Sequence, residues 1–277
     1  MTFIILVLFV SFIVSWATVK FYLEWATKRK ILDIPNQRSS HVVPTPRGGG
    51  VGILLSFFVL FSILLVYLGF HQVLLAMLAP ALVLAIVGGI DDLKGLPAVV
   101  RLLVHFLCMG VLLYVFLPPM MIVDFGESQI SAYWPVFVFL AVVGVWMINV
   151  YNFMDGIDGF AAGQVFSVCM ATGLLGLKFL DESGASGGSF LFIAGSFLLA
   201  GASLGFLVWN WPPAKIFMGD LGSGTLGFLL MGFAVWGMLS FGLYLVVFFI
   251  LNAVFLVDAK YKLIHRAKRK KKIYCSI

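Results

Sequence analysis

The chain has 277 residues, of which 62% are hydrophobic and only 11% are charged, and its formal net charge is +6. Soluble domains contain about 45–50% apolar and about 25% charged residues, so this composition excludes an ordinary soluble protein. The stretches between the apolar runs are too short to form a soluble domain. We therefore expect one membrane-embedded domain over residues 1–277.

The apolar runs, in chain order, predict an all-α bundle of about nine spans, since a helix needs roughly 20 mainly apolar residues to cross the hydrocarbon core. They cover about 3–23, 51–69, 73–90, 98–117, 134–151, 160–180, 189–208, 223–240 and 241–257. The first run follows Met1 without the basic region and small-residue cleavage site of a signal peptide. It is therefore expected to be a retained helix.

Lysine and arginine gather in the loops that follow the first, third, seventh and ninth runs. An excess of these residues marks the cytoplasmic side, so we expect the N-terminus outside and the C-terminus inside. The predicted cytoplasmic loops are 24–50, 88–97, 149–159, 209–223 and 258–277. Asp124, Glu127, Asp181 and Glu182 fall on the outer side.

The first cytoplasmic loop contains Pro44-Thr45-Pro46-Arg47, followed by three glycines. Proline and glycine favour a turn rather than a helix. One interpretation is a tight re-entry turn into the second span. The other is a cradle of backbone N–H groups that binds an anionic group together with Arg47.

The second cytoplasmic loop begins with Asp91-Asp92 at the end of a span. Adjacent carboxylates repel each other and lose hydration there, and a divalent cation or a basic partner such as Lys94 would relieve both costs. The alternative is a solvated helix end.

The third cytoplasmic loop contains Asn152, Asp155 and Asp158, which step by three residues. If the segment is helical, they lie on one face. Such hard oxygen ligands are typical of a metal or nucleotide site, and the pattern lacks the histidines and cysteines that zinc requires.

The fourth cytoplasmic loop runs from Asn210 through Phe217 to Asp220, just before the eighth run. A carboxylate at a helix start is favourable as a cap alone, and the same helix start would also suit a phosphate. Phe217 offers a ring on which a base can stack. The basic segment 268–272 is typical of an anchor to anionic lipid.

Taken together, the Pro44–Gly50, Asp91-Asp92, Asn152–Asp158 and Phe217–Ser223 motifs resemble the polyprenyl-phosphate N-acetylhexosamine-1-phosphate transferases of glycosyltransferase family 4. That superfamily includes enzymes that start O-antigen and enterobacterial common antigen synthesis, and the phospho-MurNAc-pentapeptide transferase. The resemblance covers about residues 1–272.

The resemblance implies a reaction and a set of partners. An oxygen of undecaprenyl phosphate attacks the β-phosphorus of a UDP-N-acetylhexosamine, giving undecaprenyl-diphosphate-sugar and UMP, the first step of a cell-envelope polysaccharide. The motifs favour the O-antigen branch, with N-acetylglucosamine, QuiNAc or FucNAc as the sugar. The expected location is the bacterial inner membrane, with a cytoplasmic active site, membrane lipids as neighbours, no nucleic acid, and a homodimer left open.

The resemblance also implies residue roles. Asp220 and Asp155 would hold Mg²⁺, with Mn²⁺ as the alternative ion. Asp91, Asp92 and Asp155 would be catalytic, the first two by deprotonating or positioning the lipid phosphate. The expected substrate-binding residues are Asn152, Asp158, Arg47, Thr45, Asn210, Phe217 and Lys94.

Family members usually continue into a histidine-rich motif and a further span, whereas this sequence closes with Ile-Tyr-Cys-Ser-Ile after Lys272. We therefore expect a C-terminally shortened relative, with a catalytically impaired copy as one alternative. A transporter is the other alternative. It is disfavoured because transporter sites usually lie near the middle of the bilayer, and these carboxylates lie at helix ends.

Overall fold

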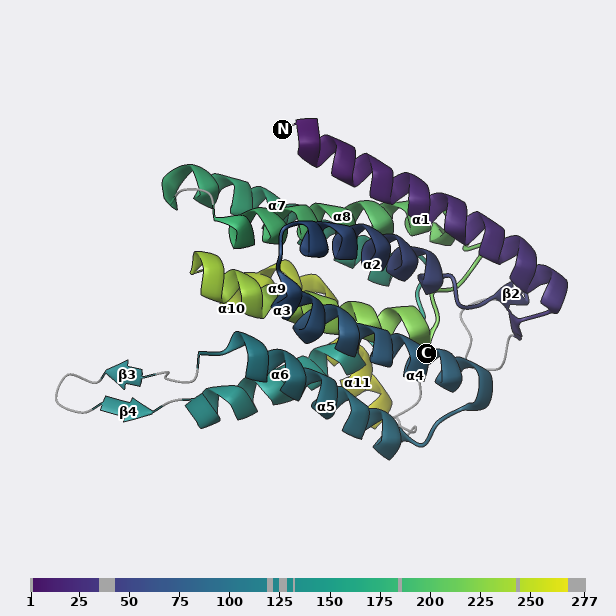
Figure 1. Ribbon diagram of the computed structural model, residues 1–277. Helices are drawn as coiled ribbons and strands as arrows, with labels where there is room; N and C mark the ends of the chain where they lie inside the picture. Colours follow the sequence, from purple (N-terminus) through teal and green to yellow (C-terminus); the bar gives the residue numbers. More distant parts are fainter. Residues whose placement is uncertain are drawn as a thin grey trace.

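A computed structural model describes residues 2–34, 43–118, 122–124, 129–131, 133–183, 186–242 and 245–268. The first and fifth predicted cytoplasmic loops therefore lie partly outside the described residues, at 35–42 and 269–277. Within the described part the chain is an all-α bundle (Figure 1). The expected fold class is confirmed.

Eight helical segments are long and apolar enough to cross a membrane, among the residues described. The third of them is continuous through a short helix, a π-helical turn and a longer helix. The segments are α1 (Thr2–Arg29), α2 (Gly50–Tyr67), α3–η1–α4 (His71–Val73, Leu74–Leu78 and Ala79–Lys94), α5 (Ala98–Phe116), α6 (Tyr133–Met154), α7 (Phe160–Ser183), α8 (Gly187–Asn210) and α9 (Asp220–Phe241). They correspond to the first eight predicted spans.

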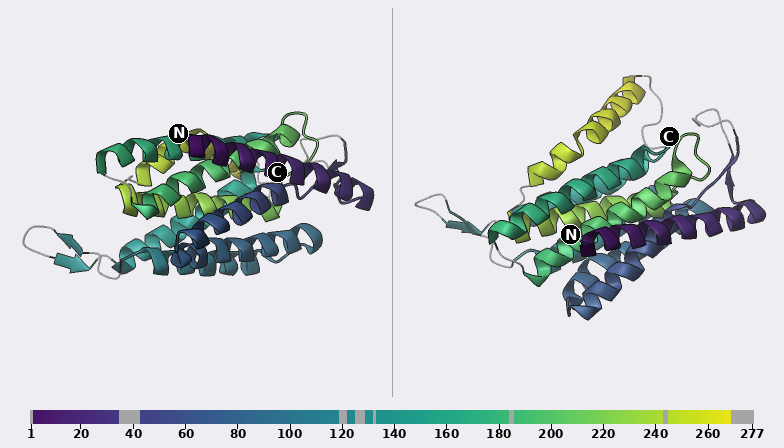
Figure 2. Two further views of the ribbon diagram at one scale, coloured as in Figure 1. Left: turned by 45° about the horizontal axis from the view of Figure 1, so that its top comes forward. Right: turned by 90° about the horizontal axis from the view of Figure 1, so that it is seen from above.

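The ninth predicted span, 241–257, is not one continuous helix in the structure. Helix α9 continues to Phe241 and ends at Gly242, which has a positive φ of 62°. Two shorter helices follow, α10 (Leu245–Leu251) and α11 (Ala253–Lys268). Figure 2 shows that this C-terminal pair leans away from the bundle.

The break between α10 and α11 falls at Asn252, whose side chain is buried. Its Nδ2 donates to the Phe248 carbonyl at 2.8 Å, and its Oδ1 accepts from the Tyr151 hydroxyl at 2.6 Å. The Gln164 Nε2 donates to the neighbouring Leu251 carbonyl at 2.7 Å. Side-chain bonds of this kind compete with the helical backbone pattern, which explains the interruption.

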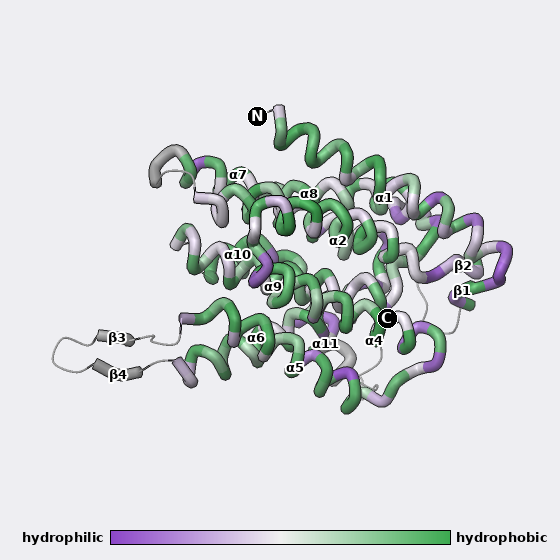
Figure 3. Tube along the Cα trace, viewed as in Figure 1, coloured by the Kyte–Doolittle hydropathy of each residue, from purple (hydrophilic) through white to green (hydrophobic). Residues whose placement is uncertain are grey.

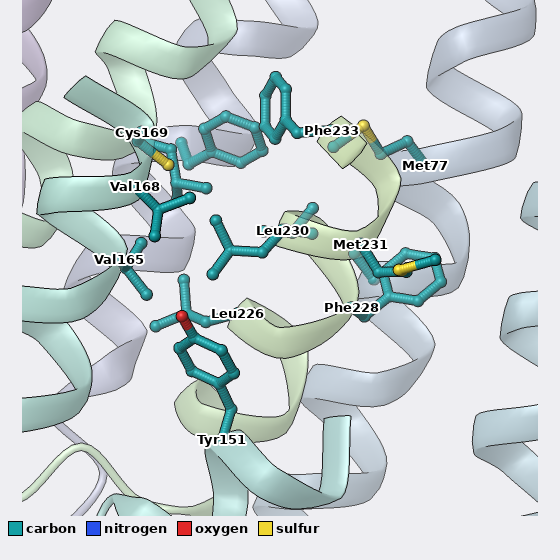
Figure 4. Close-up of a cluster of buried hydrophobic side chains, with 14 of the residues drawn as sticks. Met77, Tyr151, Val165, Val168, Cys169, Leu226, Phe228, Leu230, Met231 and Phe233 are labelled. Atoms are coloured by element: carbon teal, nitrogen blue, oxygen red, sulfur yellow. The ribbon is translucent and has the colours of Figure 1, made fainter. Parts of the chain in front are cut away.

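Helices α8 and α9 form the buried centre of the bundle. Helix α1 packs on α8 and α2, α7 packs on α8, and α4 and α6 pack on α9. Apolar side chains of α9 such as Leu226, Leu230 and Phe233 interleave with Val165 and Tyr151 from the neighbouring helices (Figure 4). Because lipid is as apolar as these side chains, close packing rather than the hydrophobic effect holds the helices together.

Two small antiparallel sheets lie at opposite ends of the bundle (Figure 1). β1 (Leu32–Asp33) pairs with β2 (Thr45–Pro46), with Leu32 opposite Pro46 and Asp33 opposite Thr45. At the other end β3 (Ile122–Asp124) pairs with β4 (Gln129–Ser131).

The described parts of the first four predicted cytoplasmic loops all connect helices at the β1–β2 end. Hydrophilic residues gather at this end, around the last turn of α1 and the two strands (Figure 3). The bundle therefore brings distant polar loops to one end.

Candidate active site

Four aspartates and two arginines meet at the β1–β2 end of the bundle. Asp91 and Asp92 lie in the last turn of α4 and Asp220 is the first residue of α9. Asp155 directly follows α6. Arg47 comes from the segment between β2 and α2, and Arg101 from the first turn of α5.

Arg47 joins two of the aspartates. Its Nη2 lies 2.7 Å from Asp92 Oδ1 and 2.8 Å from Asp220 Oδ1. Burial lowers the pKa of Arg47, but the negative charges of Asp92 and Asp220 outweigh that effect, and the net pKa is raised. The guanidinium is therefore a fixed positive charge between two carboxylates.

Arg101 holds the other side of the cluster. Its Nη1 pairs closely with Asp91 Oδ2 and lies 3.6 Å from Asp220 Oδ2. The other oxygen of Asp91 accepts from the Leu96 backbone N–H. The carboxyl groups of Asp91 and Asp220 thus lie on either side of one guanidinium. The guanidinium is therefore a shared cation that offsets the repulsion between the two carboxylates.

Asp155 faces the cluster from the turn that follows α6. Burial, and next the negative charge of Asp220, raises the pKa of Asp155 well above its ordinary value, while Arg47 and a backbone N–H of Gly219 act in the opposite direction. A carboxylate in this position gains from any further positive charge.

Asp92 binds the start of α9. Its Oδ1 accepts from the Asp220 backbone N–H at 3.0 Å, and its Oδ2 accepts from the Leu221 N–H at 3.1 Å. The next two N–H groups, of Gly222 and Ser223, donate to the Gly219 carbonyl at 3.0 Å each. The interpretation of Asp220 as the cap of this helix is therefore wrong: Asp92 is the cap. The first-turn N–H groups are also already used and do not form a free phosphate site.

Asp158 and Asn210 connect the loop after α6 to the loop after α8. Asp158 Oδ2 accepts from the Ala214 N–H at 2.9 Å. Asn210 is buried at the end of α8, accepts from the Gly159 N–H at 2.9 Å, and donates from Nδ2 to the Ile216 carbonyl at 2.8 Å. These bonds fix the backbone that leads to Asp220.

The expected helical face of Asn152, Asp155 and Asp158 does not form. Helix α6 ends at Met154, and a turn containing Gly156 and Gly159 follows, with a positive φ of 72° at Gly159. Asp155 therefore reaches the carboxylate cluster, whereas Asp158 binds the loop after α8.

Backbone hydrogen bonds join the glycine segment to the loop before α9. The N–H groups of Gly49 and Gly50 donate to the carbonyls of Phe217 and Met218 at 2.8 and 2.9 Å, and the Phe217 N–H donates to Pro46 at 2.8 Å. A Cβ on Gly50 would lie 2.6 Å from Gly222 Cα. Of the two interpretations, the anion cradle is therefore wrong for Gly49 and Gly50, and the re-entry turn holds.

The remaining predicted residues lie around this core. Thr45 is buried and its hydroxyl donates to the Val43 carbonyl at 2.9 Å. Phe217 is half-buried beside Arg47. Asn152 lies in the last turn of α6, and Lys94 is exposed as the last residue of α4. Among the described residues, neither of these last two side chains makes a hydrogen bond or ion pair with the aspartates.

A sequence profile of glycosyl transferase family 4 matches residues 74–238, which is more than half of the chain. The chain belongs to this family. The match includes all four aspartates of the cluster and Arg101, but Arg47 precedes it.

Several curated transferases are similar to this chain. A probable undecaprenyl-phosphate N-acetylglucosaminyl 1-phosphate transferase of Bacillus subtilis is 29% identical over 66% of this chain and 49% of its own length. A decaprenyl-phosphate N-acetylglucosaminephosphotransferase of Mycobacterium leprae is 32% identical over 69% of this chain and 50% of its own. A phospho-N-acetylmuramoyl-pentapeptide-transferase of a Mycobacterium species (strain KMS) is 32% identical over 69% of this chain and 63% of its own. The chain thus spans about half to two thirds of these relatives.

The acidic side chains of the cluster provide only oxygen atoms as possible metal ligands. Within the described residues no group of three acidic, histidine or cysteine side chains is arranged to hold a metal ion, and the two arginines stand among the carboxylates instead. Carboxylate oxygens are nevertheless the ligands that Mg²⁺ prefers.

Arg101 is the site residue that the sequence reasoning missed. Lys94 was considered as the basic partner of Asp91 and Asp92, but Arg101 and Arg47 occupy that position. A signal was present, because Arg101 is the only charged residue in the span 98–117 and an unpaired cation there is costly.

Proposed function

We propose that the chain transfers an N-acetylhexosamine-1-phosphate from a UDP-sugar to undecaprenyl phosphate, giving undecaprenyl-diphosphate-sugar and UMP. The family and the names of the relatives support this class of reaction. The observation that carries the proposal is the meeting of four aspartates and two arginines, drawn from separate loops, at one end of an apolar bundle. A transfer from a soluble nucleotide sugar to a membrane lipid needs a charged site at the end of the bundle, where both substrates can meet.

Asp220 and Asp155 would hold Mg²⁺, with Mn²⁺ as the alternative ion. When bound, the ion would supply charge neutralisation at the pyrophosphate and at the departing UMP. No protein nucleophile is required, because an oxygen of the lipid phosphate attacks the β-phosphorus directly. The bond between that phosphorus and the bridging oxygen breaks, and UMP leaves with the electron pair.

The arginines prepare the cluster for anionic substrates. The side chains of Arg47 and Arg101 are 32% and 31% exposed, so part of each remains accessible while it pairs with carboxylates. An open guanidinium edge can bind phosphate oxygens through two parallel N–H donors. Arg47 is therefore assigned to nucleotide or lipid phosphate binding, as the motif resemblance implies.

The proposed location is the bacterial inner membrane, with the aspartate end facing the cytoplasm. Lysine and arginine are concentrated in the loops of that end, which favours the cytoplasmic side. The product would start a cell-envelope polysaccharide, with N-acetylglucosamine as the first sugar to test.

The test incubates membranes containing the chain with labelled UDP-N-acetylglucosamine and undecaprenyl phosphate, with Mg²⁺ or with a chelator. Labelled lipid should form with Mg²⁺ and not with the chelator. The Asp220→Asn protein, inserted to the same level, is the control. The absence of labelled lipid with a panel of UDP-N-acetylhexosamines would refute the proposal.

A further inference from the structure

Helix α9 has no capping side chain from its own preceding residue. The residue before this helix is Gly219, which has no side chain with which to cap it and has a φ of +80°. A helix start leaves its first N–H groups without intrahelical partners. In this chain the missing cap comes from a different helix, because both oxygens of Asp92 in α4 accept N–H groups of Asp220 and Leu221.

Glycine residues allow the close contact between α4 and the start of α9. A Cβ on Gly88 would lie 2.5 Å from the Asp220 carbonyl oxygen, and one on Gly219 would lie 2.7 Å from Asp92 Oδ2. Only residues without side chains allow α4 to approach α9 this closely. The distance between Asp92 and the start of α9 is therefore fixed by main-chain contact.

Asp92 has little capacity left for chemistry. A carboxylate offers about four lone-pair positions. Two accept the α9 N–H groups and a third accepts Arg47 Nη2 at 2.7 Å, while only 11% of the side chain is exposed. The same Nη2 lies 2.8 Å from Asp220 Oδ1. Asp92 is thus connected to Asp220 twice, through its backbone and through Arg47.

We propose that Asp92 is a positioning residue that caps α9 from α4 and so holds the Asp220 carboxylate in place, and that it is not the proton acceptor of the reaction. The part of this inference that concerns catalysis rests on the proposed function, in which Asp220 binds a cation and acts on a substrate. The cap itself is independent of any activity.

The first experiment measures the cap without turnover. Amide hydrogen exchange is followed by mass spectrometry in purified wild type and in Asp92→Ala, Asp92→Asn and Leu93→Ala. Leu93→Ala is the matched control, because this neighbour on α4 is 72% exposed. A peptide containing Asp220 and Leu221 should exchange about fivefold to tenfold faster in Asp92→Ala, since a lost cap typically frees the first turn. Unchanged exchange in a folded Asp92→Ala protein would overturn the proposal.

The second experiment separates positioning from proton transfer. Asparagine is about as good a cap as aspartate, so Asp92→Asn keeps one acceptor for α9 and the contact with Arg47. We expect Asp92→Asn to retain about tenfold more activity than Asp92→Ala. Asp92→Ala should mainly raise the Mg²⁺ concentration for half-maximal activity, with a smaller change in KM for the UDP-sugar.

The outcomes are distinct. If Asp92→Asn is as inactive as Asp92→Ala while its exchange stays at the wild-type level, Asp92 takes part in the chemistry and the proposal is wrong. If the wild-type chain itself transfers no sugar phosphate, the proposed function fails, and the exchange experiment still decides whether Asp92 caps α9.

Discussion

Asp220 and Asp155 occupy different electrostatic positions within one cluster. Asp220 is paired with Arg47 and lies near Arg101. The pKa of Asp155, in contrast, is raised by burial and by the neighbouring carboxylates. Single carboxylates such as these were accessible to sequence reasoning, because an acid at the end of an apolar span is costly without a function or a partner.

Replacing either acid by its amide tests the proposed ligand pair. Asp220→Asn and Asp155→Asn should each lower transfer by about a hundredfold or more, since loss of a group that stabilises transition-state charge has about that effect. Asp124→Asn, in β3 at the opposite end of the bundle, should leave transfer unchanged. The rate of labelled-lipid formation is the measurement, and equal effects at all three positions would contradict the assignment.

The raised pKa of Asp155 predicts how Mg²⁺ dependence changes with pH. A proton and the ion compete for this carboxylate, so the Mg²⁺ concentration for half-maximal activity should rise as the pH falls through the raised pKa. The rise should begin well above the ordinary aspartate value of about 4. Mg²⁺ titrations at several pH values measure this. A constant requirement down to that ordinary value would show that Asp155 is not a ligand.

The position of Arg101 leads to a prediction about Mg²⁺ dependence that the sequence motifs alone do not give. Arg101→Met removes the cation from between Asp91 and Asp220, so the carboxyl groups should attract the added divalent ion more strongly. Solvent screens part of the effect, because the side chain is about a third exposed. We expect half-maximal activity at about a tenfold lower Mg²⁺ concentration, and Arg101→Lys, which keeps the charge, should stay closer to the wild type. An unchanged requirement in Arg101→Met would mean that the ion pair has no role in the site.

The close contacts between elements depend on glycine. Gly50 brings α2 against the first turn of α9, and Gly88 brings α4 against the same turn. The run of three glycines was recognisable as a turn. Its partner segment and the trans cap were not predictable, because both depend on which helices pack together, and the residue pattern of one segment does not contain that information.

Adding one methyl group tests these contacts. Gly50→Ala and Gly88→Ala place a Cβ 2.6 and 2.5 Å from backbone atoms of α9, so the helices must move apart. Overpacking of this kind typically costs about 1–3 kcal/mol. Gly110→Ala in α5 meets no atom within 4 Å and should be neutral or slightly stabilising. Thermal unfolding in detergent compares the three, and equal unfolding temperatures would contradict the contacts.

At the scale of the whole molecule, composition and apolar runs were enough to predict the bundle and eight of its spans. The ninth region was less predictable, because the interruption at Asn252 depends on the Tyr151 hydroxyl of another helix. The sequence also predicted that four loops would share one end, and in the described residues they do. The pairing of each carboxylate with a particular arginine required the three-dimensional structure.

Orientation in the membrane is a separate prediction. Single cysteines are placed at Lys94 and Gln129 in a background without Cys275, and the remaining Cys108 and Cys169 are buried. An impermeant maleimide should label the first only from the cytoplasmic side and the second only from the other side. Labelling of both from one side would contradict a bundle that crosses the membrane between them.

The hydrogen bonds between the Gly49–Gly50 segment and the Phe217–Met218 segment have a consequence for where this protein can be divided. The family match begins at residue 74, yet Arg47 and both glycine donors precede it. A fragment that starts at the match would leave two carbonyls without donors and two aspartates facing each other without their guanidinium. The smallest portion that keeps these bonds therefore has to begin before Arg47 and include α2.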